Sequence, residues 1–483
     1  MEGFMLKNLK PKHVFHYFEE LTAIPRCSGN ERQVSDYLVG FAKERKLQVF
    51  QDKALNVIIK KPGTAGYEKS PAVIIQGHMD MVCGKSEKSN HDFTKDPISL
   101  KIDGDFVRAD GTTLGADNGI GVAYGLAILD AKDIPHPPIE LLVTTGEETG
   151  MYGAASLKSD HLTGKTLLNI DAEEEGVFFV SCAGGLTLIS EFTPRWKKTS
   201  LSGLLIEISG LEGGHSGLEI VEQRANAIKL LGRILDAARK AGDFHISAIS
   251  GGTDHNAIAK EAQVIVVAEL SVLKKIKVIV VSFSKELKKE FASVDPDLQV
   301  SVASSEKVDM CLGKGPTEKL IDFLLIVPNG VQSMSADLEN LVESSLNFGV
   351  LEQSGKSIKM TLSIRSSVSS IREEITRRLE SLAKLVGAKT SRTGEYPAWH
   401  YQADSKLRDL CVSVYKEVSG SDATIQAIHA GLECGLLKEK LRETDMISFG
   451  PNLYNVHTPD EHLSKRSVAN IWVFLKAILA KLK

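Results

Sequence analysis

Cysteine, aromatic residues and long apolar runs are all scarce in this chain of 483 residues. Its six cysteines are scattered and form no C-x-x-C pair, which argues against a disulfide framework or a cysteine zinc knuckle. No uninterrupted apolar run approaches the length of a membrane span, so we expect no membrane partner. Unpaired thiols, and the lack of an apolar signal-peptide core in residues 1–7, favour a cytoplasmic protein.

A strong excess of positive charge is also missing. The formal net charge is −4, and Lys and Arg give no basic footprint for nucleic acid. Apolar residues make up 42% of the chain and charged residues 25%, as in ordinary globular proteins. Because 483 residues exceed the size of one ordinary core, we expect two or three domains.

What is present begins with a short apolar run that ends in polar residues. Residues 72–75 predict a buried strand, and Gly77 then leads into His78 and Asp80. Acidic or histidine side chains also follow other segments of the chain. These segments are Gly115, the strands predicted at 139–145 and 167–170, and the strand predicted at 446–449. The side chains that follow them are Asp117, Glu147, Glu148, Asp171 and His457.

Strands alternate with helices in the first 187 residues and again after residue 397. This alternation predicts an α/β domain with a mostly parallel sheet, in which ligands bind beyond the carboxyl ends of the strands. In residues 188–397, strands such as 204–208 alternate apolar and polar residues, as half-exposed antiparallel strands do. We therefore predict one domain from residues 1–187 and 398–483, with an α+β domain of residues 188–397 inserted.

Helices are expected from spacing and from end signals. Ser28–Glu31 matches a capping box, which predicts that a helix begins there. Apolar residues at helical spacing in the last segment predict a core-facing helix over 464–481. In the inserted domain, helices are expected near 222–241, 285–292, 317–325 and 372–386.

Two imidazoles and three of the carboxylates form a donor set that suits zinc or a similar divalent ion. One histidine and one carboxylate per ion, with a third carboxylate bridging, would hold two ions about 3.5–4 Å apart. Such a pair polarises a carbonyl and activates water near neutral pH. The chemistry also needs a carboxylate that accepts a proton without binding metal, and Glu147, beside Glu148, is the natural candidate.

Several ordered motifs resemble the di-zinc exopeptidase family. The metal motifs of that family are matched, in order, by Gln76–Asp80, Leu114–Gly119, Gly146–Gly150, Asn169–Asp171 and His457–Glu461. The aminoacyl-histidine dipeptidases within the family are matched further by His91–Pro97, Asp171–Gly176 and Ile428–Gly435. The similarity extends through nearly the whole chain.

The resemblance implies two Zn²⁺ per subunit, with Co²⁺ or Mn²⁺ as possible substitutes. It places His78 and Asp171 on one ion and His457 and Glu148 on the other, with Asp117 as the bridge.

The resemblance also implies roles around these ligands. Asp80 would orient His78, and Glu147 would be the general base. The peptide bond between Asp117 and Asn118 would be cis, as is usual in the family.

The inserted domain supplies further candidates, again by resemblance. His215 matches a lid histidine that stabilises the developing oxyanion, an effect commonly worth about 3–4 kcal/mol. Asn256 and Arg365 resemble groups that bind the substrate backbone or carboxylate, for which a guanidinium is suited. His429 and Glu433 are also assigned to substrate binding. They either form a pair behind the site, or His429 caps a helix.

These features predict metal-dependent hydrolysis of dipeptides, of the Xaa-His (carnosine-like) kind. The alternatives are a broader aminopeptidase or an N-acyl-amino-acid deacylase of the same family, or a relative that only binds. Because Glu147 and the full ligand set are present, the enzyme is favoured over the binding relative. The expected partners are a small peptide substrate and a second copy of the chain in a homodimer, with the inserted domain as lid or dimerisation domain.

Overall fold

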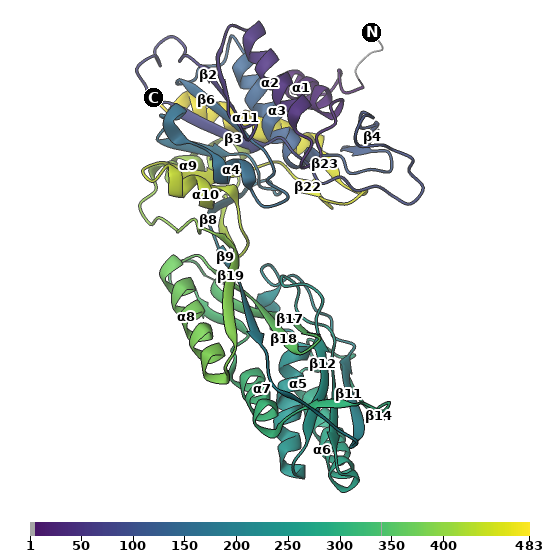
Figure 1. Cartoon of the computed structure of the whole chain (residues 1–483). Coiled ribbons are helices and arrows are strands. Elements are labelled where there is room, and N and C mark those ends of the chain that lie inside the picture. The colour runs from purple at the N-terminus through teal and green to yellow at the C-terminus, as the bar shows by residue number, and fades with distance from the viewer. Residues whose placement is uncertain (1–4, 340) are drawn as a thin grey trace. The chain divides into compact units, whose positions relative to one another are not determined.

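A computed structural model describes residues 5–339 and 341–483; residues 1–4 and 340 lie outside the described part, and with them part of the N-terminal stretch 1–7. The described chain forms two compact units (Figure 1). The first comprises the residues up to Ser181, Tyr401–Ala427 and Leu432–Lys483. The second comprises Cys182–His400 and Ile428–Gly431, and the expected insertion of residues 188–397 falls inside it.

A long mixed sheet forms the centre of the first unit. In spatial order its strands are β1 (Gln48–Gln51), β2 (Val57–Lys61), β6 (Ile139–Thr144), β3 (Val73–His78), β7 (Thr166–Asn169), β21 (Asp445–Ser448), β8 (Val177–Cys182) and β20 (Thr424–Ile428). Strands β6, β3, β7 and β21 are parallel, whereas β1, β2 and β8 pair antiparallel with their neighbours. The α/β class is thus confirmed, although the parallel part of the sheet is confined to its middle.

Helices cover this sheet. They are α1 (Lys12–Thr22), α2 (Arg32–Glu44), α3 (Ala116–Asp130), α4 (Tyr152–Ser156), the 3₁₀ turn η1 (Ser159–His161), α9 (Lys406–Ser419), α10 (Glu433–Lys440) and α11 (Lys465–Lys481). Helix α11 buries the apolar stripe that its spacing predicted. Tyr124 of α3 donates its hydroxyl hydrogen bond to the carbonyl of Val468 in α11, at 2.8 Å.

A small antiparallel sheet completes the first unit. Its strands are, in spatial order, β22 (Leu453–Tyr454), β23 (His462–Ser464), β5 (Phe106–Ala109) and β4 (Leu100–Asp103). The pairing of β22 with β23 closes a loop over residues 455–461, and the pairing of β23 with β5 anchors this loop.

The second unit is built on an antiparallel sheet. Its strands are, in spatial order, β14 (Gln299–Ser304), β11 (Ser202–Ser209), β13 (Ala262–Ala268), β12 (His245–Gly251), β17 (Val342–Ser354), β18 (Ser357–Ser366), β9 (Gly184–Phe192) and β19 (Lys389–Tyr396). Strand β16 (Gly330–Met334) pairs with β17, and β10 (Trp196–Lys198) pairs with β15 (Met310–Leu312). Strand β11 alternates buried and half-exposed residues, as its sequence predicted.

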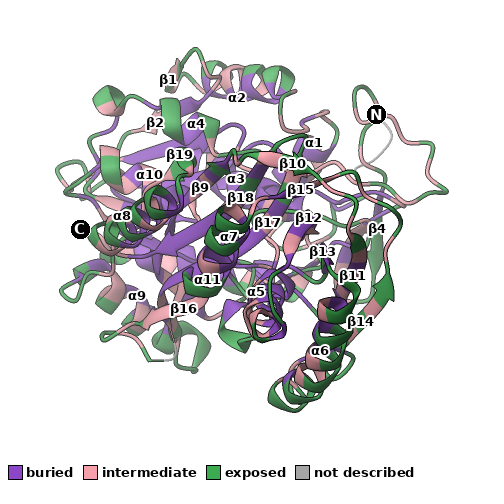
Figure 2. Cartoon of the chain, turned by 60° about the horizontal axis from the view of Figure 1, so that its bottom comes forward, coloured by how far each residue is buried: buried purple, intermediate pink, exposed green. Residues whose placement is uncertain are grey.

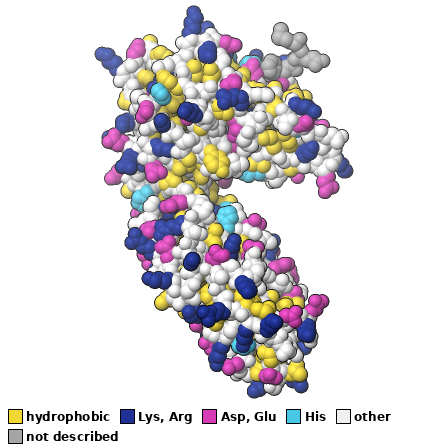
Figure 3. Space-filling view, in the orientation of Figure 1, with side chains coloured by type: hydrophobic (Ala, Val, Ile, Leu, Met, Phe, Trp, Pro, Cys, Tyr) yellow, Lys and Arg dark blue, Asp and Glu magenta, His cyan; other side chains and the backbone are white. Residues whose placement is uncertain are grey.

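Helices pack on this sheet and share its apolar core. They are α5 (Ala227–Ala238), α6 (Leu270–Glu290), α7 (Lys314–Ile326), α8 (Ser369–Val386) and the 3₁₀ turn η3 (Arg239–Ala241). The 3₁₀ turn η2 (Ile220–Glu222) lies outside this core, and its Ile220 clusters with Ile258 and Val342. In Figure 2 the strands β17 and β18 are largely buried, whereas α6 is mostly exposed. In Figure 3, Lys and Arg are intermixed with Asp and Glu over the face in view, in keeping with the small net charge.

Helix α6 is longer than the sequence indicated. A helix was expected only over 285–292, whereas α6 spans Leu270–Glu290. The middle of α6 contains the run Val278–Val281, and such β-branched residues have low helix propensity. Tertiary packing outweighs this preference, because Leu273, Ile276 and Val280 are buried at helical spacing.

The expected capping box is wrong. Helix α2 begins at Arg32, and no side chain caps it. The Ser28 hydroxyl donates instead to Asp80 Oδ2 at 2.8 Å. The hydroxyl thus donates to a buried carboxylate, a charge-assisted hydrogen bond, and does not accept from the backbone N–H groups of the first helical turn.

The expectation that no cysteines pair is wrong for Cys27 and Cys83, which form a disulfide. A parallel β-bridge pairs Cys27 with Met81, two residues before Cys83, and so brings the two cysteines together. The other four cysteines are buried thiols. Over the described residues, no helix combines the length and the apolar character that crossing a membrane requires.

Candidate functional site

Strand ends and two loops bring the candidate metal ligands into one region of the first unit. His78 is the last residue of β3, Glu148 follows β6 and Asp171 follows β7. Because these strands are parallel neighbours, their carboxyl ends meet at one edge of the sheet. Asp117 lies in the first turn of α3, and His457 lies in the loop between β22 and β23.

The Asp117 carboxylate lies between the two imidazoles. His78 Nε2 is 3.1 Å from its Oδ1, and His457 Nε2 is 3.1 Å from its Oδ2. His78 Nε2 also lies 3.5 Å from Asp171 Oδ1, and His457 Nε2 lies 3.0 Å from Glu148 Oε2. Each imidazole therefore faces one carboxylate of its own and shares the central one. The peptide bond after Asp117 is cis.

This donor set fits divalent metal. Asp171 Oδ1 is buried and has no hydrogen-bond partner, and ligand atoms of His78, Asp117 and Glu148 lie within 4.8 Å of one another. Burial lowers the pKa of His78, but Asp171, Asp117 and Asp80 outweigh it and raise that pKa well above its usual value. A pocket that favours a proton so strongly also favours a metal cation, and imidazole and carboxylate suit zinc.

The second imidazole shows the same preference for positive charge. Hydrogen bonds to Asp117 and Glu148 raise the pKa of His457 to about 10. His457 has a backbone φ of 64°, which is uncommon outside glycine. The loop anchored by β22 and β23 thus holds this histidine in an unusual conformation toward the carboxylates.

Asp80 lies behind His78. Its Oδ1 is 3.3 Å from His78 Nδ1, on the other side of the ring from Asp117. The buried carboxylate also accepts backbone hydrogen bonds from Glu147 at 3.1 Å and Glu148 at 3.3 Å. Burial opposes ionisation, but the contact with His78 and these donors lower the pKa of Asp80. A carboxylate in this place fixes the ring orientation and leaves Nε2 to face the other ligands.

Glu147 is half-buried next to the candidate ligand Glu148, and among the described residues no ion pair joins its carboxyl to an imidazole. Burial raises the pKa of Glu147 well above its usual value; His78 opposes this, while Asp171, Glu433 and Glu148 add to it. A carboxyl with a raised pKa exchanges protons near neutral pH more readily than an ordinary glutamate.

Glu433, the first residue of α10, is fully buried in the first unit. Its Oε2 accepts hydrogen bonds from Gln76 Nε2 and Thr144 Oγ1, both at 2.6 Å. Burial raises the pKa of Glu433 to about 7. His429 belongs to the second unit, where its Nε2 lies 2.7 Å from Ser345 Oγ.

His215 of the second unit has a defined ring orientation. Its Nδ1 accepts hydrogen bonds from the backbone N–H groups of Gly217 at 3.3 Å and Leu218 at 3.1 Å. Burial and the nearby Arg365 lower the pKa of His215, which keeps the ring neutral. The proton of a neutral ring that accepts at Nδ1 resides on Nε2, so His215 offers an N–H donor from Nε2.

Arg365, His215 and His429 gather around Gly217. A Cβ on Gly217 would lie 3.0 Å from His215 Cε1, 3.3 Å from Arg365 Nε and 2.6 Å from the carbonyl of His429. A side chain at position 217 would therefore clash with these groups, and at least one of them would have to move.

Two of these groups have fixed partners within the second unit. Arg365 donates to the Tyr396 hydroxyl at 2.6 Å, and its buried Nε has no hydrogen-bond partner. His429 Nε2 lies 2.7 Å from Ser345 Oγ. His429 does not cap α10, whose N-cap is Leu432 without a side-chain cap. An unpartnered guanidinium N–H in a buried place suits an anionic ligand.

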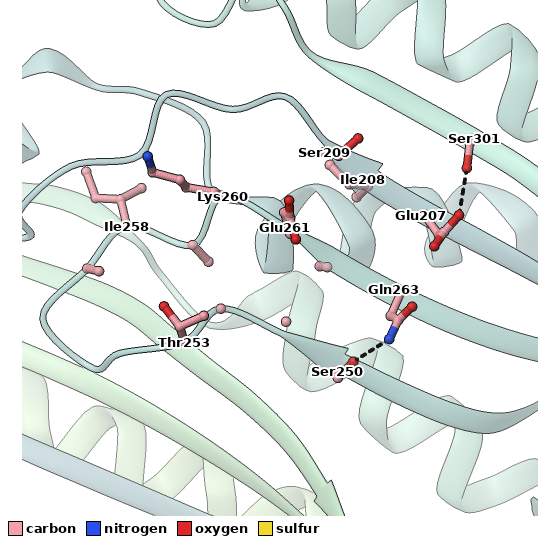
Figure 4. A pocket seen from close by; sticks show the side chains of 15 residues that line it. Glu207, Ile208, Ser209, Ser250, Thr253, Ile258, Lys260, Glu261, Gln263 and Ser301 are labelled. Carbon is pink, nitrogen blue, oxygen red and sulfur yellow. Dashed lines mark hydrogen bonds between the residues drawn. The ribbon is translucent and has the colours of Figure 1, made fainter.

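Asn256 is exposed on a loop beside His215, where Ser216 N–H donates to its carbonyl at 2.8 Å. One cavity in the described part of this unit lies elsewhere. It measures about 550 Å³ and is lined by residues such as Glu207, Thr253 and Lys260 (Figure 4). None of the predicted site residues lines it.

Sequence reasoning missed Arg26, Ser28, Ser345 and Tyr396. Each acts on a predicted residue from a distant part of the chain: Ser28 bonds to Asp80, and Tyr396 bonds to Arg365. No spacing pattern signals such partners. Glu461 was missed as well, although it closes the quoted motif His457–Glu461.

The fold and the site together define the class as metal-dependent hydrolases. Comparison with known proteins agrees: residues 74–481 match the model of Peptidase family M20/M25/M40. The chain belongs to this family.

The relatives are similar over the full length. The chain is 38% identical over 483 residues to the cytosol non-specific dipeptidase of Escherichia coli (strain K12), and 99% of each chain is covered. Its structure resembles that of aminoacylhistidine dipeptidase from Vibrio alginolyticus, with a TM-score of 0.94, 37% identity, and coverage of 99% and 98%. Aminopeptidase PepT from Bacillus cereus shares the fold, with a TM-score of 0.56, 16% identity, and coverage of 98% and 99%.

Proposed function

We propose that this chain is a metal-dependent dipeptidase and that Xaa-His dipeptides are among its substrates. The observation that carries the proposal is the Asp117 carboxylate, whose two oxygens each lie 3.1 Å from an imidazole nitrogen. Two full-length relatives bear the names non-specific dipeptidase and aminoacylhistidine dipeptidase, which supports dipeptides as the substrate class.

The proposed cofactor is two Zn²⁺ per chain, for which Co²⁺ or Mn²⁺ can substitute. His78 and Asp171 would hold one ion and His457 and Glu148 the other, with Asp117 shared. When bound, the ions would polarise the peptide carbonyl and lower the pKa of a water molecule.

Glu147 would take the proton from that water and deliver it to the leaving amine. Its raised pKa suits both steps, because a strongly acidic carboxyl would accept the proton poorly. Asp80 would keep His78 in position from the other side of the ring.

The proposed role of the second unit is that of a lid. The Nε2–H of His215 would donate to the carbonyl oxygen as negative charge develops there. Arg365 would bind the free carboxylate of the dipeptide, and Asn256 its backbone. His429 and Glu433 are proposed to support substrate binding, His429 through Ser345 and Glu433 from behind β3.

A panel of dipeptides tests the proposal. Metal-free protein should be inactive, and added Zn²⁺, Co²⁺ or Mn²⁺ should restore cleavage of β-alanyl-histidine and other Xaa-His dipeptides. Dipeptides without histidine belong in the panel, because one relative is named non-specific. N-acyl amino acids test the deacylase alternative. Absence of turnover on all of them with metal supplied would refute the enzymatic proposal.

A homodimer and a cytosolic location complete the proposal; the name of the Escherichia coli relative supports the location. Sedimentation gives the oligomeric state. Mixing Glu147→Ala protein with His215→Ala protein then shows where the lid histidine acts. Recovered turnover in the mixture means that His215 serves a neighbouring copy, and no recovery means that it serves its own chain.

A further inference from the structure

Glu461 is a buried carboxylate that none of these roles uses. It lies in the loop that carries His457 and is 2% exposed. Its Oε2 accepts the backbone N–H groups of Leu114 at 2.7 Å and Gly115 at 2.9 Å. Its Oε1 accepts those of Ala116 at 2.8 Å and Asp117 at 3.3 Å. One side chain therefore gathers four consecutive N–H groups of the segment that presents Asp117.

These N–H groups need an external partner. They lie at the start of α3, where a helix leaves its first donors without intrahelical acceptors. The N-cap residue Gly115 has no side chain, and its φ of 69° is left-handed. Asp117 and Asn118 also depart from helical dihedrals. Because the local backbone does not continue the helix here, the carboxylate of Glu461 sets the path of the turn.

Arg26 also contacts this turn. The residue is 2% exposed, and its guanidinium donates to the carbonyls of Gly115, Met79 (3.0 Å) and Asp80 (3.3 Å). A Cβ on Gly115 would lie 2.5 Å from Arg26 Nη2, and one on Gly119 would lie 2.6 Å from it. The glycines of this segment thus leave room for the cation that faces the buried carboxylates.

We propose that Glu461 is a positioning residue that aligns Asp117 with both imidazoles. Asp117 alone connects Glu461 to the imidazoles: its N–H donates to Glu461, and its carboxylate lies 3.1 Å from each imidazole. Since Glu461 and His457 share one loop, the same residue couples that loop to the turn at α3. The inference rests on the proposed metal site.

The test compares two buried glutamates. Glu140 in β6 is 2% exposed and also accepts backbone N–H groups, from Thr163 at 2.8 Å and Gly164 at 3.0 Å, but it contacts no candidate ligand. Co²⁺ is titrated into four metal-free proteins: wild type, Glu461→Gln, Glu461→Asp and Glu140→Gln. The visible absorption of bound Co²⁺ and competition with a chelator measure its binding.

Glu461→Gln should weaken Co²⁺ binding at least about tenfold and change the absorption spectrum, because an amide NH₂ would face the backbone donors. Glu461→Asp should fall between this variant and wild type. Glu140→Gln should bind Co²⁺ as wild type does, even if its melting temperature falls by as much as that of Glu461→Gln.

Three results would overturn the inference. Wild-type binding by Glu461→Gln would do so, and so would equal losses in Glu461→Gln and Glu140→Gln. If Glu461→Gln does not fold, Glu461→Asp decides against the same control; failure of both Glu461 variants to fold would make Glu461 a folding residue only. Absence of Co²⁺ binding by wild type would instead refute the metal site itself.

Discussion

The two units present their candidate residues on different scaffolds and with opposite charge. In the first, carboxylates and two imidazoles stand at the ends of parallel strands and strongly favour a cation. In the second, neutral His215 and buried Arg365 stand on a loop and an antiparallel strand, around Gly217. The proposed division, with metal binding in the first unit and recognition of an anionic substrate group in the second, requires such a difference.

The largest effect is expected when the proposed general base, Glu147, is replaced. Glu147→Gln should lower kcat about 10³-fold, because proton transfer by a positioned carboxylate contributes at this order. Metal content, measured by elemental analysis, should stay at the wild-type value. Glu174→Gln, at an exposed carboxyl nearby, is the matched control. Loss of metal in Glu147→Gln would make Glu147 a ligand and the assigned role wrong.

The disulfide lies only in the first unit, so removing it should affect that unit first. Cys27→Ser with Cys83→Ser should lower the free energy of unfolding by about 4 kcal/mol, since the link spans 56 residues. Denaturation followed by Trp472 fluorescence, with the second-unit tryptophans replaced by Phe, measures it. A reducing agent should destabilise wild type equally and leave the double variant unchanged. An unchanged midpoint in the double variant would contradict the prediction.

A carboxylate-binding role in the second unit should appear in KM. Arg365→Ala should raise KM about 100-fold with little change in kcat, because it removes a charge-assisted hydrogen-bonded contact to the substrate. A dipeptide with an amidated C-terminus lacks that carboxylate, so wild type and variant should cleave it equally. Arg392→Ala, on the exposed strand β19, serves as the control. A fall in kcat alone would place Arg365 in the chemistry.

The smallest effect concerns a buried carboxyl and pH. Burial raises the pKa of Glu433 to about 7, so the folded state favours its neutral form. This contribution is complete below the unfolded pKa of about 4.5 and is lost as pH rises through 7. Between pH 5 and 7, wild type should lose about 2 kcal/mol more stability than Glu433→Gln. Urea denaturation at each pH measures this; parallel curves would exclude the raised pKa.

The strand-end motifs illustrate what could be predicted from the sequence. His78 and Asp171 follow short apolar runs that are typical of buried strands, and parallel neighbours place such ends at one edge. The family resemblance then added the order of the ligands and the cis peptide after Asp117. The predicted bounds of helix α6 were wrong because tertiary packing outweighs the low helix propensity of its β-branched run. The predicted capping role of Ser28 was wrong because its hydroxyl donates to the distant Asp80 carboxylate.

The family, the α/β class and the residue types that can bind metal could be predicted from local patterns and ordered motifs alone. The partners of these residues became visible only in the folded chain: Asp117 between two imidazoles, Glu461 on the turn at α3, and Arg365 against Tyr396. A hydrogen bond between residues tens to hundreds of positions apart leaves no period in the sequence and appears only when the packed elements bring its atoms together.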